Sequence, residues 1–440
     1  MFSYHLRLAW LSVKRTPVMS ALMVAALGLG IGAFMTTFTV YYLMSGDPIP
    51  HKSDVLYAVQ LDNWDPNDPP TESAEDVELQ LTYQDGQNLM HMDTPAIRQA
   101  QMYASSAVVV PEGEDPPFEE RVRATYTSFF PMFDVPFLFG SPWSAADDEN
   151  RSSVVVIGKA LNDKLFAGEN SVGRTVVLND LLYRVVGVID DWQPAPRFYH
   201  ADFSRAWQDT EQVFLPFTLA VQLFLPPNGN VNCWKSPDEN LDPKEGFLQS
   251  ECVWNQFWAE LETPAQAAAY KDMLDNYVRD QKAIGRFERP LNTFLSPVKE
   301  WLEINQVVSN DNRVLLRLSF LFLLVCVVNT VGLLMAKFLG KSGEIALRRA
   351  MGASQATVFR QNLVEVAFIG VLGGVFGFGL AWLGLRAVEQ LYRGYKHLVH
   401  LDPVMLLTAV SLAILAAILA GLYPVWRVSR QAPAGLLKTQ

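Results

Sequence analysis

The sequence has few of the side chains that usually carry catalysis or metal binding. It contains only three cysteines and six histidines among 440 residues. His397 and His400 are close in sequence, but no carboxylate accompanies them in a metal-ligand spacing. No Gly-x-Ser-x-Gly elbow occurs, and the many acidic residues are scattered. We therefore expect no catalytic residue and no metal site in this chain.

A nucleotide-binding loop is also missing. Gly340-Lys341-Ser342 is similar to the end of a phosphate-binding loop, but that motif needs a glycine five residues before the Gly-Lys pair. The residue there is Met335, and it ends an apolar run rather than a soluble strand. We expect no cofactor bound by this chain.

Four long runs without charge dominate what is present. They are Val18–Met44, Leu318–Met335, Val366–Leu385 and Pro403–Trp426, of 27, 18, 20 and 24 residues. About 20 apolar residues in a helix cross the ~30 Å hydrocarbon core of a bilayer, and a helix satisfies its own backbone hydrogen bonds there. The runs predict an α-helical membrane protein with four transmembrane helices, rather than a soluble protein with four buried helices. The first run is too long for a cleaved signal peptide, so we expect it to be retained.

The basic residues predict the orientation. The N-terminal tail, the loop after the second run and the C-terminal tail carry Lys and Arg with a single acid, Glu344. The positive-inside rule places all three on the cytoplasmic side, with both termini inside. The segment Gly46–Asn312 carries 42 acids against 19 Lys and Arg, a net charge of −23, while the rest of the chain carries +12. This external, acidic segment argues against nucleic-acid binding.

The external segment is typical of a mixed α and β domain. Thr175–Leu178 and Tyr183–Ile189 have the composition of strands, and Asn179-Asp180 predicts a tight hairpin turn between them. The Pro-rich segment 192–288 predicts an inserted lobe. Tryptophans in that lobe would suit an adaptor protein if exposed and a core if buried.

The predicted boundaries follow from these runs. They are a cytoplasmic N-terminal segment 1–17, transmembrane helices 18–45, 313–335, 363–385 and 403–426, the large external domain 46–312, a cytoplasmic elbow 336–362, a short external loop 386–402 and a cytoplasmic tail 427–440. We expect the stretch 297–312 to be helical and to continue straight into the second transmembrane helix.

Two of the three cysteines lie in the external domain. Cys233 and Cys252 flank a polar loop rich in Pro, Asp, Glu and Asn, and we predict a disulfide between them. It would close about 20 residues and stabilise the fold by roughly 3 kcal/mol in the chain-entropy model. The alternative is two unpaired, buried thiols. Cys326, inside the second run, is expected to be a small apolar filler.

The cytoplasmic loop predicts a helix–turn–helix elbow. A helix over about 343–351 places Glu344 and Arg348 one turn apart as an ion pair. Gly352 suits the left-handed position that ends a helix, and Ser354 suits the cap of the next one. Such an elbow would transmit a push from a soluble partner. The alternative is an ordinary solvated basic loop.

The third run carries an acid and many glycines. Glu365 lies at its membrane edge. Three pairs have the small-x-x-x-small spacing that allows close helix contact: Gly28/Gly32, Gly370/Gly374 and Gly373/Gly377. They would serve packing within one subunit or an interface between subunits.

At these residues the chain resembles a family, the MacB/FtsX/LolC-type permeases of ABC transporters, also called mechanotransmission or type VII permeases. The elbow from Glu344 to Ala353, with Gln361, Glu365 and the glycines that follow, is similar to the family's C-terminal signature. The external stretch 127–188 resembles its periplasmic core domain, and the tail 423–438 resembles its C-terminal end.

The resemblance implies a non-catalytic permease subunit in a bacterial inner membrane. It implies a second permease, identical or homologous, and a pair of ABC ATPase subunits that bind ATP and Mg²⁺. Glu344 and Arg348, followed by Arg349 and Gly352, are the expected contacts with the ATPase. The favoured function is efflux or secretion with a periplasmic adaptor and an outer-membrane channel. The alternatives are lipoprotein extraction and signal transduction to a periplasmic hydrolase or a sensor.

Overall fold

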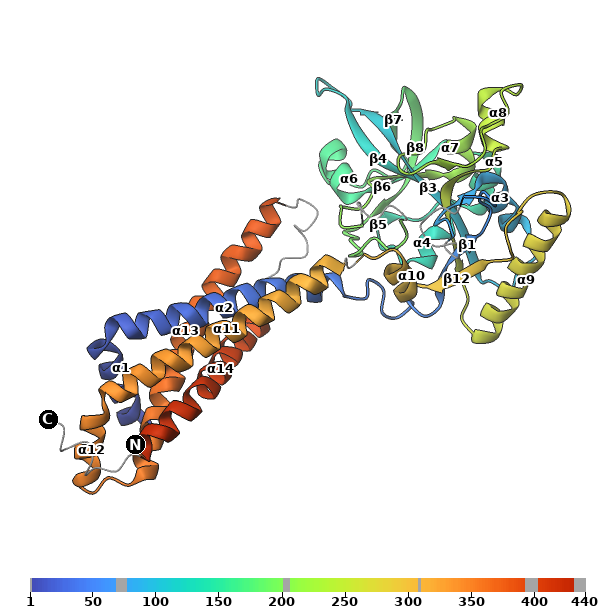
Figure 1. Cartoon of the computed structure of the whole chain (residues 1–440). Helices are drawn as coiled ribbons and strands as arrows, with labels where there is room; N and C mark the ends of the chain where they lie inside the picture. The colour runs from blue at the N-terminus through green and yellow to red at the C-terminus, as the bar shows by residue number, and fades with distance from the viewer. Residues whose placement is uncertain (1, 69–76, 201–205, 308–309, 392–402, 431–440) are drawn as a thin grey trace. The chain divides into compact units, whose positions relative to one another are not determined.

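The chain forms two compact units in a computed structural model (Figure 1). The structure describes residues 2–68, 77–200, 206–307, 310–391 and 403–430. One unit comprises Met1–Ser45 with Val308–Gln440, and the other is Gly46–Val307.

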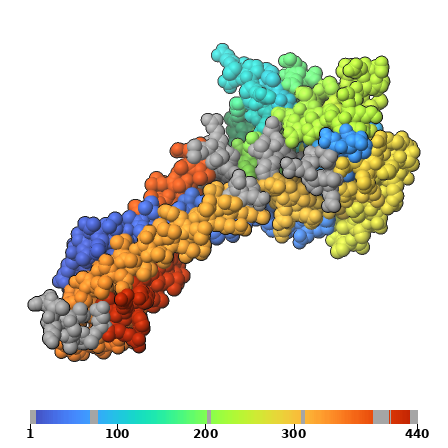
Figure 2. Space-filling model, viewed as in Figure 1, coloured from blue at the N-terminus to red at the C-terminus, as the bar shows by residue number. Residues whose placement is uncertain are grey.

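The first unit is a bundle of helices, with α11 lying side by side with α2 and α14 (Figure 2). The helices are α1 Phe2–Arg15, α2 Pro17–Met44, α11 Asn310–Gly340, α12 Ser342–Ala350, α13 Gln355–Leu391 and α14 Pro403–Ser429. Within the described residues, four of these helices are long and apolar enough to cross a membrane. This finding confirms the predicted membrane architecture. Pro17 begins α2, where its missing N–H costs no helical hydrogen bond.

The glycines pack helices of this one chain against each other on two faces of α13. A Cβ added to Gly28 or Gly32 of α2 would lie 3.2 or 3.1 Å from the carbonyl oxygen of Gly373 or Gly377. On the other face, a Cβ added to Gly370 or Gly374 would lie 2.7 or 2.8 Å from the Cβ of an alanine of α14. Hydrogen atoms in place of side chains therefore let the three backbones approach closely.

The substitution Gly370→Ala tests this packing. We expect it to lower the free energy of unfolding by about 1–3 kcal/mol, because its new methyl group overlaps Ala417 of α14. Gly379→Ala on the same helix is the control, since nothing lies within 4 Å of its added Cβ. Thermal unfolding of the purified chain in detergent measures both variants. Equal melting temperatures would contradict the assigned contact.

The second unit contains a 12-stranded mixed sheet. Its main strand order is β12-β1-β11-β3-β4-β9-β6-β8-β5, with β2 and β10 beside β11 and β7 beside β3 and β8. The strands are β1 Leu56–Leu61, β2 Leu81–Thr82, β3 Arg98–Val110, β4 Phe118–Thr125, β5 Phe137–Gly140, β6 Val154–Gly158, β7 Thr175–Leu178, β8 Leu181–Ile189, β9 Val213–Pro216, β10 Asn232–Cys233, β11 Cys252–Glu260 and β12 Thr293–Pro297. The pairs β4–β9 and β6–β8 are parallel. The first and last strands of the domain, β1 and β12, are neighbours.

Short helices connect and cover the strands. They are α3 Tyr83–His91, α4 Phe129–Met132, α5 Ala145–Asn150, α6 Lys159–Phe166, α7 Phe217–Gln222, α8 Pro243–Leu248, α9 Pro264–Ala283 and α10 Val298–Ile304. The predicted continuous helix over 297–312 is wrong. The helix α10 ends at Ile304, and Gln306 takes a positive φ of 48° that no α-helix accommodates.

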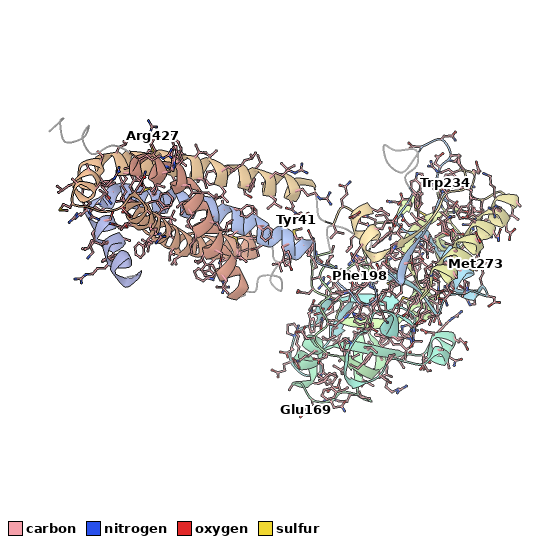
Figure 3. The ribbon with its side chains drawn as sticks, turned by 90° about the horizontal axis from the view of Figure 1, so that it is seen from below. Tyr41, Glu169, Phe198, Trp234, Met273 and Arg427 are labelled. Carbon is pink, nitrogen blue, oxygen red and sulfur yellow. A yellow bond between two sulfur atoms is a disulfide. The ribbon has the colours of Figure 1, made fainter. Side chains whose placement is uncertain are left out.

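Aromatic rings fill much of the core of this unit. Phe198, labelled in Figure 3, packs against Phe133 and Trp258 with ring centroids 5.3 and 5.5 Å apart. Trp254 and Trp258 are both buried. These tryptophans therefore serve the core rather than an exposed adaptor surface.

The segment 192–288 contributes strands to the same sheet as the rest of the domain. The strand β9 pairs with β4 and β6, and β11 pairs with β1 and β3. Cys233 on the short strand β10 and Cys252 on β11 face each other in a disulfide. The bridge thus attaches a two-residue strand to an interior strand of the sheet.

The hairpin between β7 and β8 has the geometry that its sequence predicts. Asn179 and Asp180 have φ values of 47° and 63°. Two consecutive left-handed residues define the type I′ turn, which matches the twist of the flanking strands. Asn179 Oδ1 also accepts a hydrogen bond from the backbone N–H of Val108 on β3 at 2.8 Å.

A buried carboxylate organises the loop after β4. Asp148 is 4% exposed, and it accepts hydrogen bonds from the backbone N–H of Thr127 at 2.9 Å and from Nε1 of Trp143 at 2.8 Å. Burial raises the pKa of Asp148 to about 6 in spite of these donors. The folded domain therefore takes up a proton at a higher pH than the unfolded chain.

This raised pKa predicts a pH dependence of stability. Between about pH 4 and pH 6 the folded state binds more protons at Asp148, so its contribution to the free energy of unfolding falls as pH rises, by at most about 1.4 kcal/mol per pH unit. Asp148→Asn removes this contribution. The difference between variant and wild-type melting temperatures, measured across that range, should change with pH. A difference independent of pH would contradict the assignment, and Asp147→Asn, at an exposed cap, is the control.

Candidate functional site

The candidate site lies at the end of the helix bundle that carries α12. Glu344 and Arg348 form the predicted ion pair, with Arg348 Nη2 at 2.5 Å from Glu344 Oε1. Arg348 Nη1 also donates to Gln361 Oε1 at 2.9 Å, and Arg15 of α1 lies 3.6 Å from Glu344. The pair therefore joins α12 to both α1 and α13.

The turn between α12 and α13 has the expected chemistry. Gly352 has a φ of 100°, and its N–H donates to the carbonyl of Arg349 at 3.1 Å. Ser354 Oγ accepts from the backbone N–H of Thr357 at 3.2 Å in the first turn of α13. Arg349 turns away from Glu344 and Arg348, and it donates to the carbonyl of Ser429 on α14 at 3.3 Å. The four predicted contact residues thus divide between two sides of the elbow.

The outward face of α12 is apolar, which the sequence analysis missed. Ile345 and Ala346 are buried against the bundle, while Leu347 is 53% exposed and Met351, just after the helix, is 72% exposed. Residues four apart lie on the same side of a helix. The signal was available in the i, i+4 spacing, but the Lys and Arg around it suggested a solvated surface.

Glu365 is the centre of a buried ionic cluster. Its Oε1 lies 2.9 Å from Nζ of Lys337 on α11 and 2.9 Å from Nζ of Lys341, the N-cap residue of α12. Ser12 of α1 donates to the same carboxylate, and Ser20 of α2 accepts from Lys337 at 3.1 Å. The cluster therefore ties α1, α2, α11 and α13 together.

The sequence analysis placed these lysines in the cytoplasmic elbow 336–362, after the end of the second transmembrane helix. The helix α11 instead continues to Gly340 and carries Lys337, and Lys341 follows directly as the N-cap residue of α12. Lys337 is 2% exposed and Glu365 is 5% exposed. Charges are retained at such depth only when they are paired.

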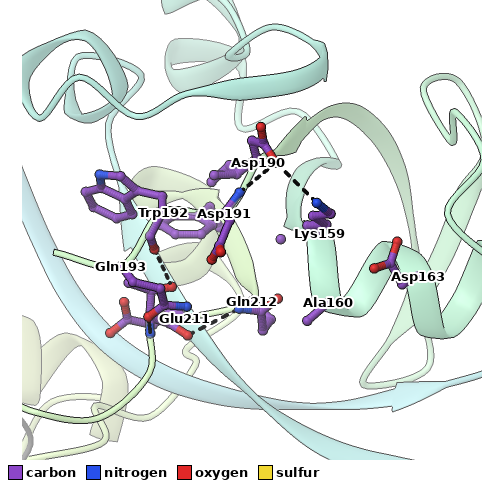
Figure 4. A pocket seen from close by; sticks show the side chains of 13 residues that line it. Lys159, Ala160, Asp163, Asp190, Asp191, Trp192, Gln193, Glu211 and Gln212 are labelled. Atoms are coloured by element: carbon purple, nitrogen blue, oxygen red, sulfur yellow. Dashed lines mark hydrogen bonds and ion pairs between the residues drawn. The ribbon is translucent and has the colours of Figure 1, made fainter. Parts of the chain in front are cut away.

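The large domain contains a separate cleft of about 190 Å³ (Figure 4). Lys159 and Asp190 lie 3.6 Å apart at its edge, and Glu211 lies among its lining residues. Burial would raise the pKa of Glu211, but Arg123 and Arg197, at 2.5 and 2.9 Å, hold it well below its usual range. Glu211 is thus a buried structural anion. Among the described residues, no group of three His, Cys, Asp or Glu side chains is placed to hold a metal ion.

Removing the charge of Glu365 should destabilise the helix bundle. Glu365→Gln leaves the buried ammonium of Lys337 without a full counter-charge, so we expect the free energy of unfolding to fall by about 3–5 kcal/mol. Adding Lys337→Met in the same chain removes that stranded charge and should recover at least half of the loss. Melting temperatures in detergent give both values, and an unaffected single variant would contradict the cluster.

Two family models match the chain. The MacB-like periplasmic core domain matches residues 20–277, and the FtsX-like permease C-terminal matches residues 317–433. Among curated proteins, the macrolide export ATP-binding/permease protein MacB of Syntrophobacter fumaroxidans is 22% identical over 82% of this chain and 53% of its own length. The pyoverdine export ATP-binding/permease protein PvdT of Pseudomonas fluorescens is 24% identical over 71% of this chain and 42% of its own length. The chain spans about half the length of the curated relatives that it matches.

Solved structures that resemble part of the chain are domains of similar proteins. The periplasmic region of MacB from Actinobacillus actinomycetemcomitans is 14% identical, covers 60% of this chain and 96% of its own, and has a TM-score of 0.36. The extracellular domain of the ABC-type transporter YknZ from Gram-positive bacteria is 11% identical, covers 55% of this chain and 99% of its own, and has a TM-score of 0.35.

The two family models match consecutive parts of the chain, and the first includes most of α2 as well as most of the large domain. The periplasmic core model covers more than half of the residues, and the permease model covers α11, α12, α13 and α14. With four membrane helices, an elbow and a large α+β domain in the expected order, the chain belongs to the MacB/FtsX-type family of ABC transporter permeases.

Proposed function

We propose that this chain is the permease subunit of an ABC transporter and that α12 receives force from a separate ATPase. The supporting observation is that Leu347 and Met351 are exposed, while the charged residues of α12 contact the neighbouring helices. A short helix with apolar anchors four residues apart suits a groove on a partner protein. The ATPase would bind ATP and Mg²⁺.

Side-chain contacts between α12 and its neighbours indicate how a displacement of α12 would be transmitted to the other helices. Arg348 links α12 to Gln361 of α13, and Lys341, which precedes α12, is bound to Glu365 of the same helix. The residue Arg349 links the elbow to α14. A displacement of α12 would therefore move α13 and α11 together instead of bending the loop alone.

The basic ends of the bundle support the orientation. With the elbow in the cytoplasm of a bacterial inner membrane, the acidic domain lies in the periplasm, and both termini lie inside. We propose that two permeases, identical or homologous, act with a pair of ATPases. The named export functions of the relatives favour efflux or secretion, with a periplasmic adaptor and an outer-membrane channel.

Affinity purification of the tagged chain from its native membrane in mild detergent, with mass spectrometry, tests the assembly. An ATPase together with an adaptor is the expected result. An ATPase with a hydrolase or a sensor, and no adaptor, would replace efflux with signal transduction. No ATPase, under conditions that preserve other ABC complexes, would contradict the proposal for α12.

The double variant Leu347→Ser, Met351→Ser tests the docking helix. Both side chains are exposed, so stability should change by less than about 0.5 kcal/mol, while ATPase co-purification should fall at least about tenfold. The charge reversal Glu344→Lys should weaken the complex as well. The control is Gln355→Ser, which is exposed on the first turn of α13. Undiminished co-purification by the double variant would rule out α12 as the contact.

A further inference from the structure

A groove of about 80 Å³ lies between α1, α12 and the first turns of α13. Its α1 wall is formed by Leu8, Leu11 and Arg15, and Arg348 and Asn362 line it from the two other helices. Leu347 and Met351, the proposed anchors for an ATPase, are absent from its lining. The groove and the docking face are therefore different surfaces of the same elbow.

The charges around the groove are unbalanced. Four cations, Arg15, Lys337, Lys341 and Arg348, share two carboxylates, those of Glu344 and Glu365. The other acids of the helical unit are Asp311 at the start of α11, Glu389 near the end of α13, and Asp402. Lys337 does not line the groove, so the three cations and two carboxylates that do line it leave about one positive charge there, which favours an anionic ligand.

Asn362 supplies an independent indication of a ligand. This residue is 6% exposed and lines the groove, and its Nδ2 has no hydrogen-bond partner among the described residues. A buried amide N–H without an acceptor destabilises the folded state. A ligand oxygen in the groove would satisfy it.

The helix α1 has the character of a helix that lies in a membrane interface. It contains no acid, ends in Lys14 and Arg15, and leaves Trp10 and Leu11 nearly half exposed. Trp10 packs edge-on against Phe368 of α13, with ring centroids 6.1 Å apart. Apolar and basic side chains on such a helix sit at the boundary of acyl chains and headgroups.

We propose that the groove binds the phosphate-bearing headgroup of an anionic phospholipid. Arg15 and Arg348 contact the phosphate, and Nδ2 of Asn362 donates to a phosphate or ester oxygen. The leucines of α1 contact the part of the acyl chains nearest the headgroup. Basic pockets between membrane helices are suited to such headgroups. This site requires the helix bundle but not the proposed ATPase.

Native mass spectrometry of the full chain, released from phosphatidylcholine nanodiscs that contain phosphatidylglycerol, tests the site. Wild type should retain phosphatidylglycerol in preference to phosphatidylcholine. Asn362→Leu should weaken that retention about tenfold, because it removes a hydrogen bond to a charged group. Arg15→Gln should weaken it to a similar extent.

Arg360→Gln is the matched control. Like Arg15, it removes one exposed arginine from this end of the bundle, but Arg360 does not line the groove. It should leave retention within about twofold of wild type. An equal loss in all three variants would reduce the effect to general attraction between charges and would overturn the site. So would equal retention of the two lipids by wild type.

Two further measurements distinguish a phospholipid from other ligands that could occupy the groove. Competition by inorganic phosphate at the lipid concentration would assign the groove to a free anion and overturn the lipid proposal. Weaker ATPase co-purification by Asn362→Leu, with lipid retention unchanged, would assign the groove to a protein segment instead. Melting temperatures should match wild type in every variant, since Asn362 Nδ2 has no hydrogen-bond partner in the described part of the chain and Arg15 is largely exposed.

Discussion

The carboxylate of Glu365 is the interaction on which the helical unit depends. It contacts Lys337 of α11, Lys341 at the start of α12 and a serine of α1 inside an apolar bundle. An ammonium group held there without a counter-charge would be far less stable than in water, so α11 and α13 have a strong electrostatic reason to assemble in one register. Lys341 also precedes the first residue of α12. The cluster thus fixes where the elbow begins and how the helix that follows is presented.

The large domain uses a comparable device for a different purpose. Glu211 is enclosed by two arginines and by the hydroxyl of Tyr199 at 2.9 Å. Arg123 comes from β4 and Glu211 precedes β9, and these strands form one of the parallel pairs. The ionic network therefore helps to specify a pairing that cannot be closed by a short hairpin.

Much of the architecture could be predicted from the sequence. Membrane helices are recognisable because their apolar runs have the length of a bilayer, and the Asn179-Asp180 turn is recognisable because few residues accept a left-handed backbone. The elbow was predictable for similar reasons, since Glu344, Arg348 and Gly352 act through neighbours that are near in sequence.

The rest depends on contacts that are distant in sequence. In the sequence, Lys337 cannot be told apart from a lysine of a solvated basic loop. It reaches Glu365 only because α11 continues past the apolar run. Likewise, the order of the strands in the sheet follows from pairings such as β1 with β11, for which no local pattern exists. No sequence pattern singled out Asn362, because its proposed role rests on an Nδ2 that finds no hydrogen-bond acceptor within the described ranges.

The position of β1 has a consequence for how the protein is made. This first strand of the external domain has β11 and β12 as its two neighbours, and they begin only at Cys252 and Thr293. During synthesis, both edges of β1 stay unpaired until almost the whole domain has been made, because its two partner strands come late in the chain. Unpaired edges invite aggregation, and contacts this distant form slowly. The domain is therefore most exposed to aggregation just before α11 is synthesised, when β12 has only just become available to β1.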